Sequence, residues 1–292
     1  MANNLNLFIT CVAIWGSTWL AIKFQLGVVA PEASVFYRFL LASLLLFAYC
    51  LARRLPLRYT LREHAWIALL GVFMFSVSYI FVYYAEEHVV SGLVAVGYSA
   101  SPLLGMLGMR LFFGTAMTPR LALGSALGIA GIALVFWPEF SHVRSDGNPG
   151  LGAIYTAIAV IVSTLGSMVA HRNQEAHLPL WQSMAWGMLY GALFSLGVAV
   201  AAGKPLAFEL AVPYVASLFY LAILGSIVAF AAFFTLLKRI GAARAGYTGV
   251  MVPIVALVIS SIFESFSWHP LTVVGIAVSV LGNVVILREK AA

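Results

Sequence analysis

The chain has 292 residues, of which 63% are hydrophobic and only 9% are charged, and its formal net charge is +6. Soluble globular chains carry about 25% charged residues, so this composition excludes a soluble fold and leaves no room for a soluble catalytic domain. The positive charges lie in short breaks between apolar runs, which argues against a nucleic-acid-binding surface.

Ten apolar runs follow one another along the chain, and each is long enough for a membrane-spanning helix, which takes about 20 residues. Uniformly apolar runs favour helices over the alternating strands of a membrane barrel. We therefore predict an all-α integral membrane protein with ten transmembrane helices. The expected spans are 5–26, 32–51, 65–85, 91–113, 121–138, 151–171, 179–202, 212–236, 245–264 and 270–287.

Lysine and arginine are distributed very unequally between alternating loops. The odd-numbered loops hold only Arg144 and Lys204. The even-numbered loops and the C-terminal segment hold twelve: Arg53, Arg54, Arg58, Arg62, Arg110, Arg120, Arg172, Lys238, Arg239, Arg244, Arg288 and Lys290. Because cytoplasmic loops carry the excess of positive charge, we expect both termini in the cytoplasm and the chain as a multi-pass protein of the bacterial inner (plasma) membrane.

Several prolines and glycines of the first part of the chain recur 151 residues later in the second part. The matched pairs are Pro102 and Pro253, Pro119 and Pro270, Gly124 and Gly275, and Gly131 and Gly282. Five helices in each copy is an odd number, so the copies would cross the membrane in opposite directions. Inverted repeats of this kind are typical of secondary transporters, whose sites lie near the midplane between the halves. We expect halves 1–138 and 151–292, a linker loop at 139–150, and alternating access.

Small residues spaced four apart permit close helix packing. They occur at Gly124 and Gly128 and again at Gly187 and Gly191. The favoured interpretation is packing within one chain, and a dimer face is the alternative. The expected oligomeric state is therefore a monomer or a homodimer.

Three local sequences resemble the EamA-type repeat of the drug/metabolite transporter superfamily. They are IWGSTWLAIK at 14–23, PEASVFYRFLLA at 31–42, and SASPLLGMLGMRLFFG at 99–114, followed by TPR and a glycine-spaced helix. The resemblance covers nearly the whole chain, and within the superfamily it is most similar to bacterial amino-acid exporters, including aromatic ones. It implies a ten-helix carrier with a central cavity lined largely by helices 1, 3, 4, 6, 8 and 9. One departure is Gly114-Thr115, where the family often has Gly-Glu.

The candidate substrate-binding residues are aromatic and hydroxyl side chains in the middle parts of the expected helices. They are Trp15, Ser17, Thr18, Trp19, Tyr79, Tyr83, Tyr98, Ser99, Ser101, Ser163, Thr164, Ser167, Tyr247 and Thr248. Rings can pack on the apolar part of a solute, hydroxyls can bind its polar end, and a ring face can bind an ammonium. This set favours a small amphipathic substrate. For each residue the competing interpretation is an interfacial belt or helix packing.

Two prolines and one arginine stand inside expected helices. Pro102 and Pro253 each remove a backbone hydrogen bond, so each is interpreted as a hinge, with a static kink as the alternative. Arg38 is a candidate functional charge. It lies near the expected outer face, where Glu32, Glu86 or Glu87 could pair with it or where it could snorkel, so a structural role is expected. Lys23 lies at an outer helix end and is interpreted as an interfacial anchor.

Missing motifs narrow the function further. The chain has no G-x-x-x-x-G-K-[ST] sequence, so no ATP site of that kind is expected. Cys11 and Cys50 lie in apolar runs and indicate neither a disulfide framework nor a metal site, and no cofactor is expected. No Asp or Glu falls at the middle of an expected helix. Because proton-driven carriers usually hold a buried carboxylate, facilitated transport is favoured, although Glu264 keeps proton antiport open.

These observations predict an exporter of small amphipathic metabolites, with amino acids, aromatic ones among them, as the favoured class. The first alternative is a drug/metabolite–proton antiporter for another substrate class. The second, less favoured, is an intramembrane enzyme, which would need His, Asp or Glu clustered at one depth. The partners expected are a small-molecule substrate and the lipid bilayer, with no nucleic acid and no ATP.

Overall fold

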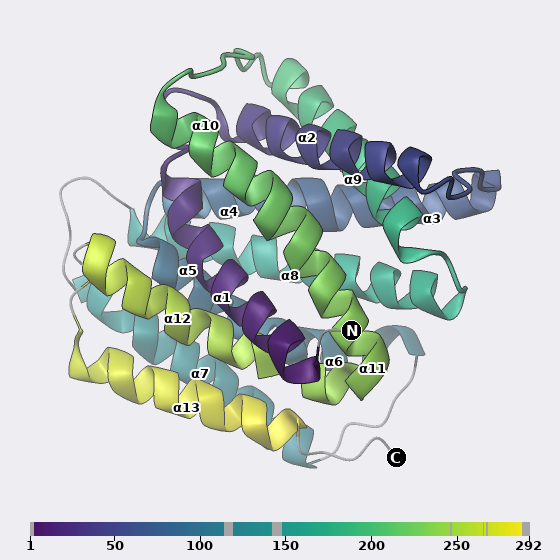
Figure 1. The fold of residues 1–292 in the computed structure, drawn as a ribbon. Helices are drawn as coiled ribbons and strands as arrows, with labels where there is room; N and C mark the ends of the chain where they lie inside the picture. Colours follow the sequence, from purple (N-terminus) through teal and green to yellow (C-terminus); the bar gives the residue numbers. More distant parts are fainter. Residues whose placement is uncertain are drawn as a thin grey trace.

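The computed structural model describes residues 3–113, 119–141, 148–245, 247–264, 266 and 268–287, and the regular structure of these residues is entirely helical. The α-helices are α1 (Asn4–Lys23), α2 (Pro31–Ala52), α3 (Leu61–Val72), α4 (Ser78–Glu86), α5 (Ser91–Gly97), α6 (Ser101–Phe113), α7 (Pro119–Ser141), α8 (Pro149–Glu175), α9 (Leu180–Ala201), α10 (Val212–Phe219), α11 (Ala229–Ala245), α12 (Tyr247–Phe263) and α13 (Pro270–Leu287). Figure 1 shows them as a bundle, in which α1 begins and α13 ends at the same end.

Local sequence explains several helix boundaries. Proline occupies the first turn of α2, α7, α8, α10 and α13, where its missing N–H leaves no intrahelical bond unmade. Thr60 and Glu63 form a capping box at the start of α3, in which the Glu63 carboxylate accepts from the Thr60 N–H at 2.7 Å. Beyond the end of α9, Gly203 has φ +63°, a left-handed conformation that glycine adopts without strain.

Three short irregular segments join consecutive α-helices. The segments η1 (Phe73–Val77) and η3 (Tyr220–Val228) are π-helical, and η2 (Tyr98–Ala100) is a 3-10 turn. Adding the repeat offset of 151 to 73–77 gives 224–228, which lies inside η3. Widened turns of this kind occur often at functional sites, and here they lie 151 residues apart, which is the offset of the matched prolines and glycines in the sequence.

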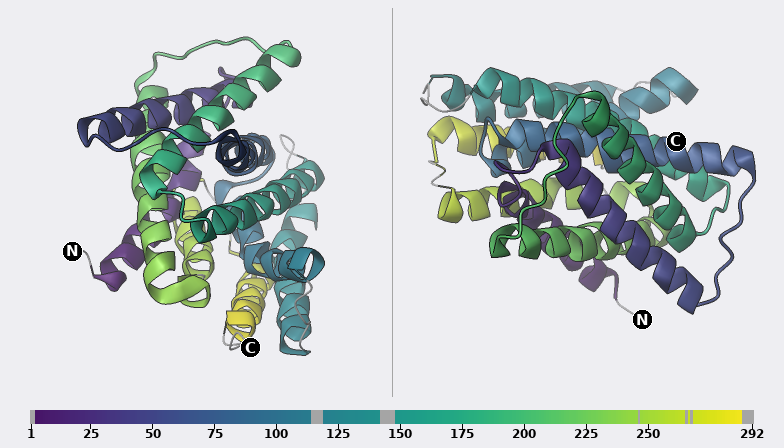
Figure 2. Two further views of the ribbon diagram at one scale, coloured as in Figure 1. Left: turned by 90° about the vertical axis from the view of Figure 1, so that its right-hand side faces the viewer. Right: turned by 90° about the horizontal axis from the view of Figure 1, so that it is seen from above.

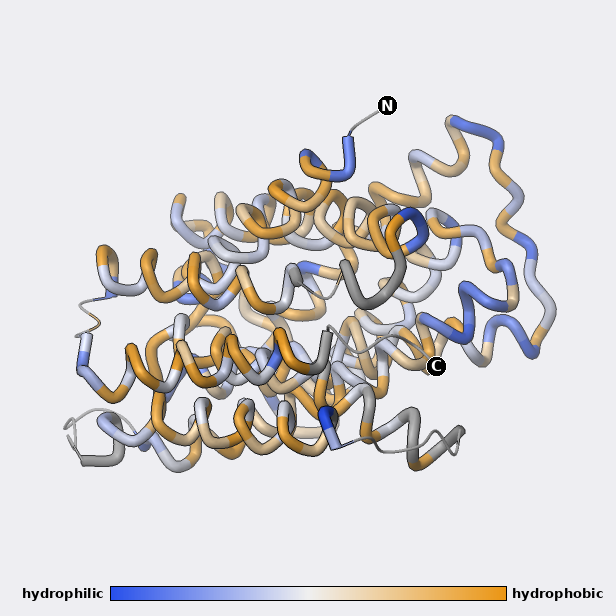
Figure 3. The backbone as a smooth tube through the Cα atoms, turned by 90° about the horizontal axis from the view of Figure 1, so that it is seen from below, coloured by the Kyte–Doolittle hydropathy of each residue, from blue (hydrophilic) through white to orange (hydrophobic). Residues whose placement is uncertain are grey.

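Six stretches of the described chain are long and apolar enough to cross a membrane: Asn4–Lys23, Pro31–Ala52, Leu61–Glu86, Pro149–Glu175, Leu180–Ala201 and Val212–Ile240. Shorter apolar helices are Ala122–Pro138, Thr248–Phe263 and Pro270–Val285. Figure 3 shows hydrophobic residues along the helices and hydrophilic residues mostly near their ends. This is the architecture of an all-helical membrane protein. The count of ten crossings and the cytoplasmic position of the termini stay predictions.

Helices α7 and α13, which correspond to each other in the repeat, pack side by side through glycines (Figure 2). A Cβ built on Gly131 would lie 2.6 Å from the Gly275 carbonyl oxygen, and one on Gly282 would lie 2.6 Å from the Gly124 carbonyl oxygen. Since Gly124 corresponds to Gly275 and Gly131 to Gly282, each contact is the image of the other. The later residue of one helix meets the earlier residue of the other, so the two helices run antiparallel.

Both of the glycine pairs that were expected to mediate helix packing contact other helices of the same chain. Gly124 and Gly128 meet Gly282, as the contacts of α7 with α13 require. A Cβ on Gly191 would lie 2.8 Å from the Gly71 carbonyl oxygen, which places α9 against α3. The prediction of packing within one chain is confirmed for both pairs.

Candidate functional site

Three of the predicted residues on α1 contact the π-helical segment η3 of the second half. The Trp15 Nε1 donates to the Gly225 carbonyl oxygen at 3.3 Å. The hydroxyls of Ser17 and Tyr220 are 2.6 Å apart. Thr18 is buried, and its methyl carbon would lie 2.8 Å from a Cβ on Gly225. Glycine at 225 therefore lets α1 approach the widened turn closely.

A second group of predicted residues surrounds Trp19, which lies one turn after Trp15 on α1. The rings of Trp19 and Tyr98 are 5.2 Å apart, centre to centre. Tyr98 belongs to η2, which contacts α8, the helix that carries Ser163. Trp19 Nε1 is buried and has no hydrogen-bond partner within the described part of the chain. Aromatic side chains of α1 and η2 thus meet beside α8.

Several predicted hydroxyls are used within their own helices instead. Thr164 donates to the Val160 carbonyl at 2.8 Å, and Thr248 donates to the Ala245 carbonyl at 2.7 Å. Ser167 is exposed and bonds to the carbonyl of Ser163. Back-bonding of this kind satisfies a hydroxyl in an apolar environment without a second helix. Ser99 is buried and Ser101 half-buried, while the side chain of Tyr247 lies outside the described residues.

The two candidate hinge prolines have different surroundings. Pro253 is buried inside α12, which continues through it. The neighbouring Val255 packs on α1, because a Cβ on Gly16 would lie 2.8 Å from the Val255 Cβ. Pro102 follows the 3-10 turn η2, and its side chain lies outside the described residues. The hinge interpretation of both prolines stays a prediction.

Arg38 differs from its prediction. Its side chain is 1% exposed, and its Nε donates to the Ser226 hydroxyl at 3.1 Å. Its guanidinium lies 4.4 Å from the ring centre of Tyr79 and 5.1 Å from that of Phe39, a cation–π arrangement. No carboxylate among the described residues lies within 4.0 Å of it. The expected ion pair with Glu32, Glu86 or Glu87 is absent, and the side chain does not snorkel because η3 and α4 cover this face of α2.

The expectation that no carboxylate is buried is wrong. Glu86 is fully buried at the end of α4, and neither of its carboxylate oxygens has a partner in the described chain. Glu32 is 1% exposed and accepts a hydrogen bond from the Tyr84 hydroxyl. Both were placed at helix ends and assigned to the membrane surface, but neighbouring helices enclose these ends. The argument for facilitated transport from missing buried acids therefore fails.

A polar clasp joins the two halves at the same end of the bundle. We define it as Lys23, Ser91, Ser260 and Glu264. The Glu264 carboxylate accepts from the Ser91 N–H at 3.1 Å and from the hydroxyls of Ser91 and Ser260. The Ser260 hydroxyl in turn accepts from the Gly92 N–H at 2.9 Å. Helices α5 and α12 are thereby held together across the repeat.

Lys23 takes part in this clasp and is not a simple interfacial anchor. Its Nζ donates to the backbone carbonyl oxygens of Glu86 and Val89, the latter at 3.0 Å, and lies 3.9 Å from the Glu264 carboxylate. Sequence reasoning missed this residue because it assigned a charge at a helix end to the lipid interface. The i, i+4 spacing of Ser260 and Glu264 was a signal that could have been used.

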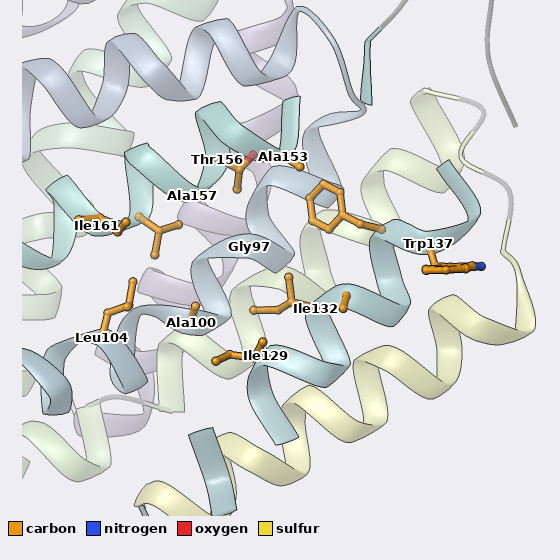
Figure 4. A pocket seen from close by; sticks show the side chains of 13 residues that line it. Gly97, Ala100, Leu104, Ile129, Ile132, Trp137, Ala153, Thr156, Ala157 and Ile161 are labelled. Carbon is orange, nitrogen blue, oxygen red and sulfur yellow. The ribbon is translucent and has the colours of Figure 1, made fainter. Parts of the chain in front are cut away.

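An apolar pocket of about 650 Å³ lies between α5, η2, α6, α7 and α8 (Figure 4). Its inner wall includes Gly97, Ala100 and Thr156, and at its rim Ile129, Trp137 and Ile161 are exposed. Its lining is almost entirely aliphatic and aromatic. This pocket offers apolar contact only and is separate from the buried charges.

Replacing Tyr98 with alanine should lower the transport activity expected from the sequence about tenfold, with the yield of folded protein unchanged. The change removes the ring packed on Trp19, and aromatic pairs contribute about 0.5–1.5 kcal/mol beyond their burial. The measurement is transport by purified variants in liposomes, with Ser99→Ala as a second test. Ser167→Ala is the control, because the Ser167 side chain is exposed and its hydroxyl bonds to a carbonyl of its own helix. Unchanged transport in Tyr98→Ala would remove this residue from the site.

Comparison with known proteins gives a consistent set of similarities. A profile of the EamA-like transporter family matches residues 5–137 and 150–288. The uncharacterized inner membrane transporter YedA of Escherichia coli K12 is 31% identical, over 85% of this chain and 78% of that protein. An uncharacterized transporter of Archaeoglobus fulgidus is 22% identical over 96% of both chains. A solved crystal structure with 18% identity matches 97% of this chain and 96% of its own with a TM-score of 0.69, which supports the fold alone.

Proposed function

The chain belongs to the EamA-like transporter family, and from this premise we propose that it is a secondary transporter that exports small amphipathic metabolites across the bacterial inner membrane. Amino acids, aromatic ones among them, are the substrate class. The observation that carries the proposal is the group of aromatic and hydroxyl side chains where α1 meets η2 and η3. Both halves of the chain contribute to it, so a relative movement of the halves would change its exposure.

The proposed mechanism is alternating access between two five-helix halves, 1–138 and 151–292, in inverted orientation. The reciprocal, antiparallel contacts of Gly131 with Gly275 and of Gly282 with Gly124 support it. The matching positions of η1 and η3 support it independently. The excess of lysine and arginine in even-numbered loops favours cytoplasmic termini.

A second candidate function is proton-coupled antiport, and Glu86 is the observation that favours it. A fully buried carboxylate with two unpaired oxygens is a group that could take up a proton during a transport cycle. Proteins similar to this chain are named as transporters, which favours transport over an intramembrane enzyme.

Uptake of labelled tryptophan, phenylalanine and threonine into liposomes holding the purified protein tests both candidates. We expect saturable uptake of the aromatic amino acids above that of protein-free liposomes. Accumulation beyond equilibrium only with a pH gradient would establish proton coupling, and uptake that ignores the gradient would establish facilitated transport. If none of the three amino acids enters, the amino-acid assignment is wrong.

A further inference from the structure

Unpaired polar atoms of both signs gather where α1 ends, α2 begins and α4 ends. Two are donors, Arg38 Nη1 and Gln25 Nε2, and two are acceptors, the carboxylate oxygens of Glu86. All three side chains are at most 1% exposed, and none of these four atoms has a hydrogen-bond partner in the described residues. Buried polar atoms in native proteins are nearly always paired, so this concentration calls for a partner.

Tyr83 shows that these groups are neighbours. Its hydroxyl donates to Gln25 Oε1 at 2.6 Å. The guanidinium of Arg38 lies 4.4 Å from the ring centre of Tyr79, which is one turn before Tyr83 on α4. Because Tyr83 and Glu86 are three residues apart on α4, their side chains share one face of the helix.

The two charges do not satisfy each other. Arg38 and Glu86 are not within 4.0 Å of each other in the described chain. The nearby cation Lys23 does not pair with the Glu86 carboxylate either, since it donates to the backbone carbonyls of Glu86 and Val89 and faces Glu264. An uncompensated charge in a membrane interior is unfavourable, and such residues mark sites for charged ligands.

We propose that Arg38 and Glu86 are the two poles of a binding site for a zwitterion. Arg38, assisted by the amide of Gln25, binds the carboxylate of the ligand, and Glu86 binds its ammonium. The rings of Tyr79 and Phe39 beside Arg38 offer apolar contact for the rest of the molecule. This inference rests on the proposed function and narrows its substrate class to solutes that carry both charges, which excludes simple amines and simple acids.

The test compares L-phenylalanine with two analogues that each lack one charge: phenethylamine has no carboxylate, and 3-phenylpropionate has no ammonium. Binding to the purified full-length protein is measured by calorimetry, and competition against labelled phenylalanine is measured in liposomes. We expect both analogues to bind at least about 30-fold more weakly than phenylalanine, because a site built to pair a charge rejects a ligand without it.

Variants assign each pole. Arg38→Met should weaken phenylalanine binding and reduce the preference over phenethylamine, whereas Glu86→Gln should reduce the preference over 3-phenylpropionate. Substitution of a residue that only stabilises the fold would weaken the binding of all three ligands by a similar factor. Glu87→Gln is the matched control, since Glu87 is exposed beside Glu86. If the variants do not fold, the comparison of the three ligands on the unchanged protein still tests the zwitterion site.

Equal binding of either analogue would overturn the zwitterion site and leave the transporter standing. Unchanged analogue preferences in a folded Glu86→Gln protein would remove Glu86 as the ammonium pole. If phenylalanine, threonine and glycine betaine all fail to bind, the zwitterion site is wrong. Transport of another solute class in the same liposomes would then show that the carrier function survives.

Discussion

Leucine in place of Gly131 should lower the free energy of unfolding by about 3 kcal/mol, near the upper end for overpacking. The added side chain would meet the backbone of Gly275 and Ser279, and a backbone inside a helix cannot move aside as a flexible side chain can. Helices α7 and α13 would have to separate along their length. Thermal or denaturant unfolding of the detergent-solubilised protein measures the loss.

The corresponding change Gly282→Leu should cost about as much, because its contact with Gly124 and Gly128 is the image of the first. Gly197→Leu is the control: this glycine lies on the exposed face of α9, and a Cβ added to it would have no neighbouring atom within 4 Å. A Gly131→Leu protein as stable as the control would show that α7 and α13 are not packed as described.

Alanine in place of Glu264 should open the polar clasp. The change leaves the N–H and hydroxyl of Ser91 without their acceptor and leaves Lys23 without its nearest carboxylate. Loss of a hydrogen-bonded buried charge costs about 3 kcal/mol. Because about 1.4 kcal/mol is a factor of ten, amide hydrogen exchange of α5 should become roughly 100-fold faster.

Exchange mass spectrometry of Ser91–Gly97 measures this effect in lipid nanodiscs. Glu264→Gln keeps an acceptor oxygen, so its α5 exchange rate should lie between those of the parent protein and the alanine variant. Glu175→Ala is the control, because Glu175 is an exposed acid at the end of α8 whose only ion-pair partner among the described residues is His171. If α5 exchanges as slowly in Glu264→Ala as in the parent protein, the clasp does not stabilise α5.

The helical class was predictable because twenty-residue apolar runs have few other solutions. The matched prolines and glycines also predicted which helices would correspond, and Gly131 and Gly282 pack as that correspondence implies. The irregular segments η1 and η3 were not predicted. A π-helical turn depends on one extra residue accommodated by neighbouring helices, and Phe73–Val77 carries no local signal for it.

The candidate site was predicted in part. Trp15, Ser17, Trp19 and Tyr98 were chosen from their chemistry, and each makes contacts between helices. The buried charges were misjudged because distance along a helix was used as a measure of depth. Whether Glu86 meets water depends on how α1, α2 and α8 pack against α4, so no local pattern reveals it.

The seam between α7 and α13 has the form of an isologous subunit interface, in which one surface meets a copy of itself. A polypeptide ending after α7 would already carry a complete self-complementary surface. Joining two such units in one chain adds no contact, but it replaces a concentration-dependent association with an intramolecular one at a fixed effective concentration. Covalent linkage also allows the sequence of each half to change independently of the other. In this chain Arg38 and Glu86 lie in one half, and Gly225 and Ser226 lie in the other. A homodimer of identical halves would be symmetric, so it would carry this arrangement twice.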